Sequence, residues 1–196
     1  AERLAGLGDA EPKAAESCTT HLTVADKNGM MVAMTTTLLS SMGSRVVLPK
    51  SGVLMNNGVM WFDPRPEAKN AIAPGKRPLT NMCPVIAADG DKPVIATGAS
   101  GGRRIMASVF QMLSFVSDFG MEPEEAAHHP RLDVSAPEGV TADIRLGAET
   151  LAALAAEDEV TEVEHAVLPV NFACPNLIRI GADGLRTGIT DAMSPW

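Results

Sequence analysis

An alternating run of residues directly after Thr19 and Thr20 constrains the fold of this chain more than any other feature of its sequence. Residues 21–26 alternate in character, residues 27–29 form the turn sequence Lys-Asn-Gly, and a second run covers residues 30–37. This pattern predicts a strand, a tight hairpin and a partner strand. Thr19 would then stand at the exposed start of a core strand.

A threonine at that position carries its own catalytic groups if it becomes a chain terminus. Its hydroxyl is a nucleophile, and its α-amine, with a pKa of roughly 7.7 to 8.0, is partly unprotonated at neutral pH and can accept the hydroxyl proton. No separate histidine is needed. Taken alone, however, Thr19-Thr20-His21 is more often simply the start of a β-strand.

The rest of the chain predicts strands in pairs, then helices, then strands again. Residues 98–102 are rich in glycine and predict a turn that leads directly into an amphipathic helix, while residues 38–52 and 63–76 predict long loops. Helices are expected at residues 103–119, from about residue 122 and at 148–157, and further strands at 84–88, 93–97, 160–164, 176–180 and 185–189. This order indicates an α+β fold.

Composition excludes several classes of partner. The net charge of -8 comes from scattered acids, which argues against a nucleic-acid or anionic-lipid surface, and no stretch of about 18 apolar residues predicts a membrane span. The compartment, cytoplasmic or periplasmic, stays open. Cys18, Cys83 and Cys174 lack zinc-site spacing and are expected to be buried free thiols. The adjacent His128 and His129 lack acid or cysteine partners at ligand spacing, so no metal is expected.

A set of short motifs follows in order from Thr19 towards the C-terminus. They are Thr19-Thr20-His21, Asp26, Gly29, Thr35-Thr36-Thr37, Gly43-Ser44, Asn56-Asn57, Lys76-Arg77-Pro78-Leu79, Pro84 and Gly98-Ala99-Ser100-Gly101-Gly102. Together they resemble the small, catalytic subunit of the gamma-glutamyltranspeptidase family. The resemblance implies an N-terminal-nucleophile hydrolase without a cofactor, in which this chain supplies the catalytic half of an αββα sandwich.

The resemblance also implies a precursor that cuts itself between Cys18 and Thr19. Residues 1–18, whose composition predicts a helix end and a loose linker, would be the tail of the large subunit. Residues 19–196 would form the small-subunit domain, with the large subunit of the same precursor as partner and a dimer of such heterodimers as a further expectation. While the bond is intact, the amine of Thr19 is an amide and the protein is a dormant zymogen.

Four residues match the catalytic positions of the family. Thr19 matches the nucleophile, Thr37 matches a threonine that supports it, and Gly101 and Gly102 would offer backbone N–H groups to the oxyanion of a tetrahedral intermediate. A phosphate loop is the weaker alternative, because the glycine-rich stretch lacks the lysine and spacing of a Walker sequence. Arg103 and Arg104 would either hold an anion or be solvated.

The substrate-binding positions depart from the family pattern. Gamma-glutamyl enzymes have Asn where Leu39 stands, Gln or Glu at Gly58, Asp at Trp61, and a Ser-Ser pair at Thr80-Asn81. The missing aspartate grips the ammonium group of the glutamyl donor, and a tryptophan cannot replace that charge. These departures indicate an acyl group other than γ-glutamyl.

Three functions remain open on the sequence. The first is a self-processing threonine amidohydrolase or acyltransferase that cleaves a small-molecule amide through an acyl-enzyme. The second is a true gamma-glutamyl transferase or hydrolase that acts on glutathione-like substrates with an unusual pocket. The third is a catalytically silent relative that serves as a structural or binding subunit.

Overall fold

The computed structural model of the chain describes residues 18–166 and 170–191. Two compact units divide the chain: unit 1 comprises Ala1–Cys18 and Thr37–Pro78, and unit 2 comprises Thr19–Thr36 and Leu79–Trp196. Most of the predicted linker, residues 1–17, lies outside the described residues. The division at Thr19 concerns processing of the chain, and it stays a prediction.

A four-stranded antiparallel sheet forms the centre of unit 2. Its order is β3 (Val85–Asp89), β4 (Lys92–Ser100), β8 (Cys174–Ile180) and β9 (Arg186–Thr190). Each outer strand is joined to its neighbour by a short glycine-containing turn, as the sequence predicts. The expected turn at residues 98–102 begins too early, because Gly98, Ala99 and Ser100 continue β4 and pair with β8.

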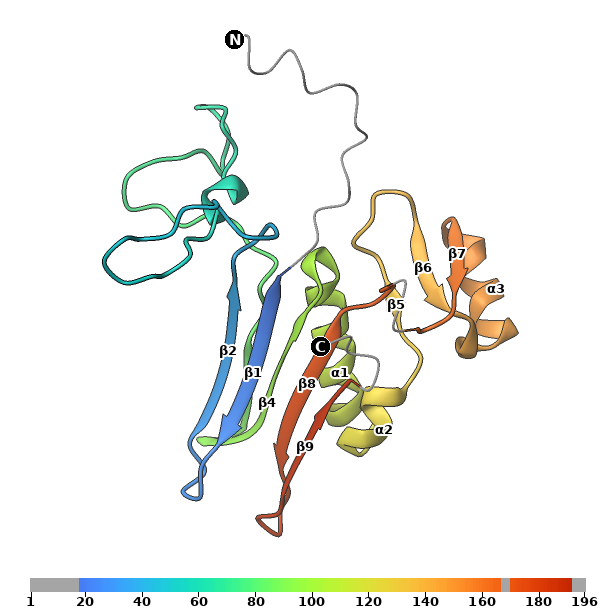
Figure 1. Ribbon diagram of the computed structural model, residues 1–196. Helices are drawn as coiled ribbons and strands as arrows, with labels where there is room; N and C mark the ends of the chain where they lie inside the picture. The colour runs from blue at the N-terminus through green and yellow to red at the C-terminus, as the bar shows by residue number, and fades with distance from the viewer. Residues whose placement is uncertain (1–17, 167–169, 192–196) are drawn as a thin grey trace. The chain divides into compact units, whose positions relative to one another are not determined.

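Two helices pack on one face of this sheet (Figure 1). A 3-10 turn (Gly102–Arg104) leads into α1 (Ile105–Ser117), and α2 (Pro123–His128) follows, with Pro123 in its first turn where a missing N–H costs nothing. The buried side chains of α1 recur at helical spacing and meet those of β4 and β8; this core contains Ile95, Ala99, Ile105, Val109, Met112, Val116, Ala126, Ala127, Ala173 and Leu177.

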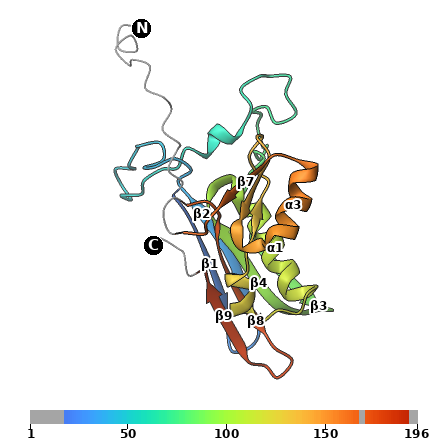
Figure 2. The same ribbon diagram turned by 90° about the vertical axis from the view of Figure 1, so that its right-hand side faces the viewer.

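The predicted hairpin is present as β1 (Thr19–Ala25) and β2 (Met31–Thr37), which form a two-stranded sheet. Asp26 closes its turn: its backbone N–H donates to the Met30 carbonyl over 2.9 Å, and its side-chain carboxylate accepts from the Met30 N–H over 2.9 Å. One face of β1 packs on β4 and β8, opposite the helices, so that Figure 2 shows hairpin, sheet and helices as successive layers. The other face exposes Leu22, Val24, Val32 and Met34 by 36% to 50%.

A small three-stranded sheet completes unit 2. Its strands are β5 (Leu132–Asp133), β6 (Val140–Asp143) and β7 (Val160–Val163), and α3 (Ala148–Glu157) connects the parallel pair β6 and β7. The helix and β7 are predicted correctly. The sequence analysis missed β5 and β6; β5, with two residues, is too short to display an alternating pattern.

A buried ion pair joins the segment after α2 to the end of β9. The Arg131 and Asp191 side chains are each only 1% exposed and form a salt bridge, and His165 Nε2 lies 3.6 Å from the same carboxylate oxygen. The Arg131 guanidinium also donates to the Ala127 carbonyl over 3.0 Å. Loss of one partner would leave a buried charge uncompensated, which costs about 3–5 kcal/mol.

The described part of unit 1 consists mainly of loops, in agreement with the predicted loops at residues 38–52 and 63–76. Its regular elements are a 3-10 turn, η1 (Gly58–Trp61), and isolated bridges between Val47 and Leu54 and between Asp63 and Ala71. No helix in the described part of the chain is long and apolar enough to cross a membrane.

Candidate active site

Thr19 begins β1, and the contacts of β1 with β8 fix which end of the sheet it approaches. The Asn176 side chain on β8 donates to the His21 carbonyl on β1 over 2.9 Å. At the other end of β8, Ile180 pairs with Arg186 on β9. Arg186 donates to the carbonyl of Asp26, the residue that follows β1. Strands β1 and β8 therefore run in the same direction. Thr19 precedes His21, so it lies towards the end of the sheet where β4 finishes.

Gly101 and Gly102 form the turn at that end of β4. Their φ angles are 139° and 65°, a region that side chains disfavour. A Cβ at Gly101 would also approach the Ala173 Cα to 2.6 Å, whereas a Cβ at Gly102 would meet nothing within 4 Å. The turn leads into α1, so its N–H groups stand at the positive end of a helix.

Asn81 forms a hydrogen bond to this turn, whereas Thr80 bonds to a neighbouring residue. The Asn81 side-chain amide donates to the Gly102 carbonyl. Thr80 is exposed, and its hydroxyl accepts from the backbone N–H of Met82 over 3.2 Å. Of the two predicted substrate-binding residues, only Asn81 is therefore joined to the predicted oxyanion turn by a hydrogen bond in the described structure.

The other predicted site residues belong to unit 1. The Thr37 hydroxyl accepts a hydrogen bond from the backbone N–H of Leu39 over 2.9 Å, and Leu39 has a φ of 73°, a left-handed conformation that is strained for a leucine. Gly58 and Trp61 are the first and last residues of η1. Both are half-buried.

Cys18, on the other side of the predicted cleavage bond, is half-buried and its thiol donates to the Ser40 carbonyl over 3.1 Å. Cys18, Cys83 and Cys174 are free thiols, as expected. They are all only partly buried, so the expectation of buried thiols is wrong.

The two adjacent histidines differ in exposure and in contacts. His128 is exposed at the end of α2, whereas the His129 ring packs against Phe115 with the centroids 4.5 Å apart and the ring planes tilted by 49°. Across residues 18–166 and 170–191, no group of three or more histidine, cysteine or acidic side chains is arranged to hold a metal ion.

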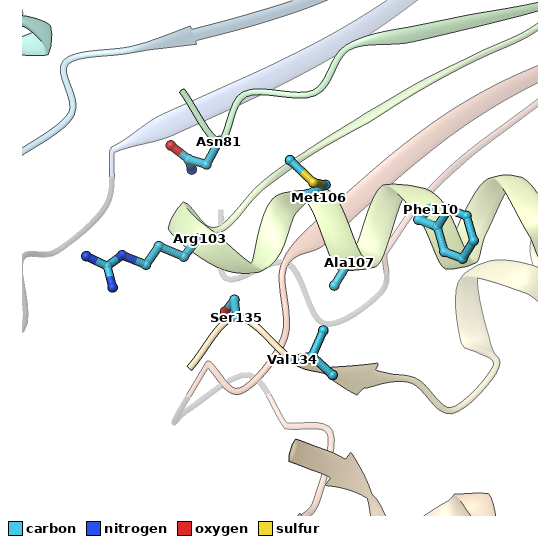
Figure 3. Close-up of a pocket in the computed structure, with 7 residues that line it drawn as sticks. All are labelled: Asn81, Arg103, Met106, Ala107, Phe110, Val134 and Ser135. Atoms are coloured by element: carbon cyan, nitrogen blue, oxygen red, sulfur yellow. The ribbon is translucent and has the colours of Figure 1, made fainter. Parts of the chain in front are cut away.

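A shallow pocket of about 390 Å³ lies along α1 beside the Gly101–Gly102 turn (Figure 3). Asn81 and Arg103 stand at one end, and Met106 and Phe110 continue along the helix, with Val134 on the facing segment. The complete lining is Asn81, Arg103, Met106, Ala107, Phe110, Val134 and Ser135. Apart from its polar end, this pocket suits an apolar group.

His21 is the residue of this region whose placement the sequence analysis did not foresee. Its side chain is 8% exposed and inserted between the hairpin and the sheet, and burial lowers the pKa of the imidazole. The signal was available in the alternation of β1, which assigns His21 and Thr19 to the same face. The placement of His21 was not predicted, because an N-terminal threonine needs no histidine as its base.

Comparison with known proteins identifies the family. A family model described as Gamma-glutamyltranspeptidase matches residues 4–192 of the chain. The chain belongs to the gamma-glutamyltranspeptidase family. Its sequence is 41% identical to the glutathione hydrolase proenzyme of Bacillus subtilis strain 168 over 117 residues, which cover 60% of this chain and 20% of that protein. It is 39% identical to the acylase ACY 1 proenzyme of Pseudomonas sp. strain SE83 over 114 residues, covering 58% and 20%.

Solved gamma-glutamyltranspeptidase structures share the fold. A threonine-to-alanine mutant of the Helicobacter pylori gamma-glutamyltranspeptidase superposes with a TM-score of 0.75 and 29% identity, covering 89% of this chain and 100% of that chain. The expected α+β, N-terminal-nucleophile hydrolase fold is therefore confirmed. The matched part spans about a fifth of the length of the two curated relatives.

Proposed function

We propose that this gamma-glutamyltranspeptidase family member is a self-processing threonine amidohydrolase or acyltransferase. The observation that carries the proposal is the position of Thr19 at the start of β1, at the end of the sheet where β4 turns through Gly101 and Gly102. A terminal threonine would supply nucleophile and base together. The glycine N–H groups would stabilise the charge that develops on the attacked carbonyl.

Maturation would use the same hydroxyl. The Thr19 oxygen attacks the Cys18 carbonyl, the C–N bond breaks, and the ester that forms is hydrolysed by water to leave a free Cys18 carboxylate and a free Thr19 amine. The intact bond keeps that amine as an amide, which cannot accept a proton. Cleavage would thus create the base at the moment it exposes the nucleophile.

In turnover, the Thr19 amine takes the hydroxyl proton as the oxygen attacks the substrate amide. The tetrahedral oxyanion accepts hydrogen bonds from Gly101 and Gly102, and the amine returns its proton to the leaving nitrogen. The resulting acyl ester then reacts with water, or with an acceptor amine in the transferase reaction. Thr37 would assist by orienting the nucleophile.

The acyl group proposed is not γ-glutamyl. Trp61 stands where a carboxylate would pair the glutamyl ammonium group, and Leu39 replaces a polar neighbour, so a desolvated ammonium would lack a partner there. Within unit 2, the pocket that Asn81 lines has its own apolar wall, formed by Met106, Phe110 and Val134. An apolar acyl chain fits this composition better than an amino acid does.

We also propose that the large-subunit part of the precursor covers the outer face of the hairpin. A two-stranded sheet is only marginally stable alone, and its four exposed apolar residues, Leu22, Val24, Val32 and Met34, form one continuous face. The matched region makes up 20% of the Bacillus subtilis relative, so about four-fifths of that protein lies outside it. Replacing Val24 by Asp should prevent co-purification of the two parts, while Leu185→Asp, at an exposed apolar residue just before β9, should not.

A substrate panel tests the function. The full-length protein is incubated with γ-glutamyl anilide and with anilides of simple acids of increasing chain length, and kcat/KM is compared. Preference for the simple anilides supports the proposal. Preference for γ-glutamyl anilide favours the second function, which the glutathione hydrolase relatives also suggest. No turnover, with the Cys18–Thr19 bond intact by mass spectrometry, would indicate a silent subunit.

A further inference from the structure

His21 links the nucleophile strand to its neighbours through both its backbone and its side chain. Its Nδ1 lies 2.7 Å from the Thr35 hydroxyl oxygen on β2, and its carbonyl accepts from the Asn176 side chain on β8. The imidazole thus connects the two strands of the hairpin at the point where the hairpin contacts the sheet.

Gly98 on β4 makes room for this imidazole. A Cβ at Gly98 would lie 2.1 Å from His21 Cε1 and 2.4 Å from Nε2, far inside van der Waals contact. The φ of Gly98 is not positive, so any residue could adopt its backbone conformation. Residue 98 must lack a side chain because the ring of His21 occupies the space that a Cβ would need.

The contact between His21 and Gly98 sits close to the groups proposed to do the chemistry. Thr19 is two residues before His21 on one strand, and Gly101 is three residues after Gly98 on the other. Both intervals run towards the same end of the sheet. A shift of the ring against β4 would therefore move the proposed nucleophile relative to the proposed oxyanion turn.

Packing stability alone does not explain a histidine at this position. Its Nε2 is buried and has no hydrogen-bond partner within residues 18–166 and 170–191. An unsatisfied buried polar atom costs about 1–3 kcal/mol. A leucine of similar volume would fill the same space without that cost, but it would lose the hydrogen bond to Thr35 that fixes the ring.

We propose that His21 is a positioning residue, which seats its ring over Gly98 and thereby sets the distance between Thr19 and the Gly101–Gly102 turn. This inference rests on the proposed function of Thr19. The imidazole does not touch the substrate in this scheme. It acts through the strand it belongs to, and Thr35 and Gly98 are its two supports.

The test measures kcat and KM of the full-length protein and the rate of cleavage between Cys18 and Thr19. His21→Leu and Gly98→Ala should each lower kcat by about 10- to 100-fold, since a displacement near 1 Å has that effect, with KM changed less than about twofold. The isosteric Thr35→Val change, which removes only the hydrogen bond, should lower kcat to a smaller extent.

Two controls separate positioning from general damage. Gly188 lies on β9 of the same sheet, and a Cβ there would meet only Ile178 Cγ1 at 3.6 Å, an ordinary contact. Gly188→Ala should leave kcat unchanged. In a His21→Ala background the ring is gone, so Gly98→Ala should cost much less than in the native protein, a non-additivity that reports direct coupling.

The inference is overturned if folded His21→Leu and Thr35→Val variants keep the native kcat, or if Gly98→Ala and Gly188→Ala have equal effects. A native protein that neither cuts at Thr19 nor turns over amides refutes the proposed function instead. Thermal melts establish which variants are folded, and Thr35→Val provides a decision even where the larger changes unfold the protein.

Discussion

The indole ring of Trp61 lies against Gly58, so that a Cβ added at Gly58 would come within 3.1 Å of the indole Cζ3 and 3.3 Å of Cε3. Both are positions at which we expect departures from the family pattern, and the structure gives a physical reason why the two would change together. The ring takes up space that a side chain at residue 58 would need. Trp61 is half-buried, and it is outside the buried core.

The contact between Trp61 and Gly58 allows the proposed acyl-group specificity to be tested. Trp61→Asp combined with Leu39→Asn should raise kcat/KM for γ-glutamyl anilide relative to simple acyl anilides, because a carboxylate becomes available to the ammonium group. Gly58→Gln should leave the protein folded only in variants in which Trp61 has also been replaced. A folded double variant with no gain on the γ-glutamyl substrate would contradict the specificity argument.

Leu39 offers a separate prediction on stability. Its φ of 73° costs a branched side chain about 1–2 kcal/mol, a penalty that asparagine largely avoids. Leu39→Asn should therefore raise the free energy of unfolding, measured by urea denaturation, by up to about 1 kcal/mol. The neighbouring Leu38 is not in a left-handed conformation, and Leu38→Asn should be neutral or destabilising.

Replacement of the nucleophile should stop both reactions. Thr19→Ala removes the hydroxyl proposed to serve in maturation and in turnover, so the mass of the purified protein should show an intact Cys18–Thr19 bond and no activity. Thr19→Ser should retain part of each. Thr20→Ala is the matched control, because the exposed Thr20 should contribute to neither. A cleaved, active Thr19→Ala protein would refute the central proposal.

The two glycines of the turn should respond differently. Gly101→Ala places a methyl group within 2.7 Å of Ala173 Cβ and should lower kcat by about 100-fold or more as the proposed oxyanion donor moves. Gly102→Ala meets no neighbour within 4 Å and carries only backbone strain. Self-cleavage should suffer less than turnover in both. A changed KM with native kcat would assign the turn to substrate binding.

Stability should fall as the solution is acidified. Burial lowers the pKa of His21 below its ordinary value of 6.5 and is also the largest cause of the lowered pKa of His165. The unfolded chain therefore binds protons first, so stability is complete above pH 6.5 and is lost as the pH falls towards the folded-state pKa values. Urea titrations from pH 7.5 to 5 should show this loss, and His21→Leu should reduce its slope. An unchanged slope would mean that His21 does not titrate in this window.

Local patterns were enough for the elements with strong periodicity. The alternation after Thr19, the turn at Asp26 and the apolar spacing from Ile105 to Val116 predicted β1, β2 and α1. The end of β4 depended on pairing with Asn176, far away in sequence, so glycine composition alone placed the turn too early.

The candidate site was predictable only where residue identity carries the chemistry. Thr19, Gly101 and Gly102 follow from motif order, and their roles remain proposals. The burial of His21 over Gly98, and the contact of Trp61 with Gly58, depend on tertiary packing. No pattern within a single strand or turn contains that information.

The hydrogen bond from Thr23 to the side chain of Asn176 spans 153 residues of sequence, and this has a consequence for the order of events during synthesis. At roughly 5–20 residues per second, a ribosome needs about 8–30 s to make that interval. The strand that begins with the proposed nucleophile is therefore synthesised well before its anchor on β8. Self-cleavage that depends on this anchor would wait until Asn176 has been synthesised, so that the bond before Thr19 would stay intact while β1 has no partner on β8.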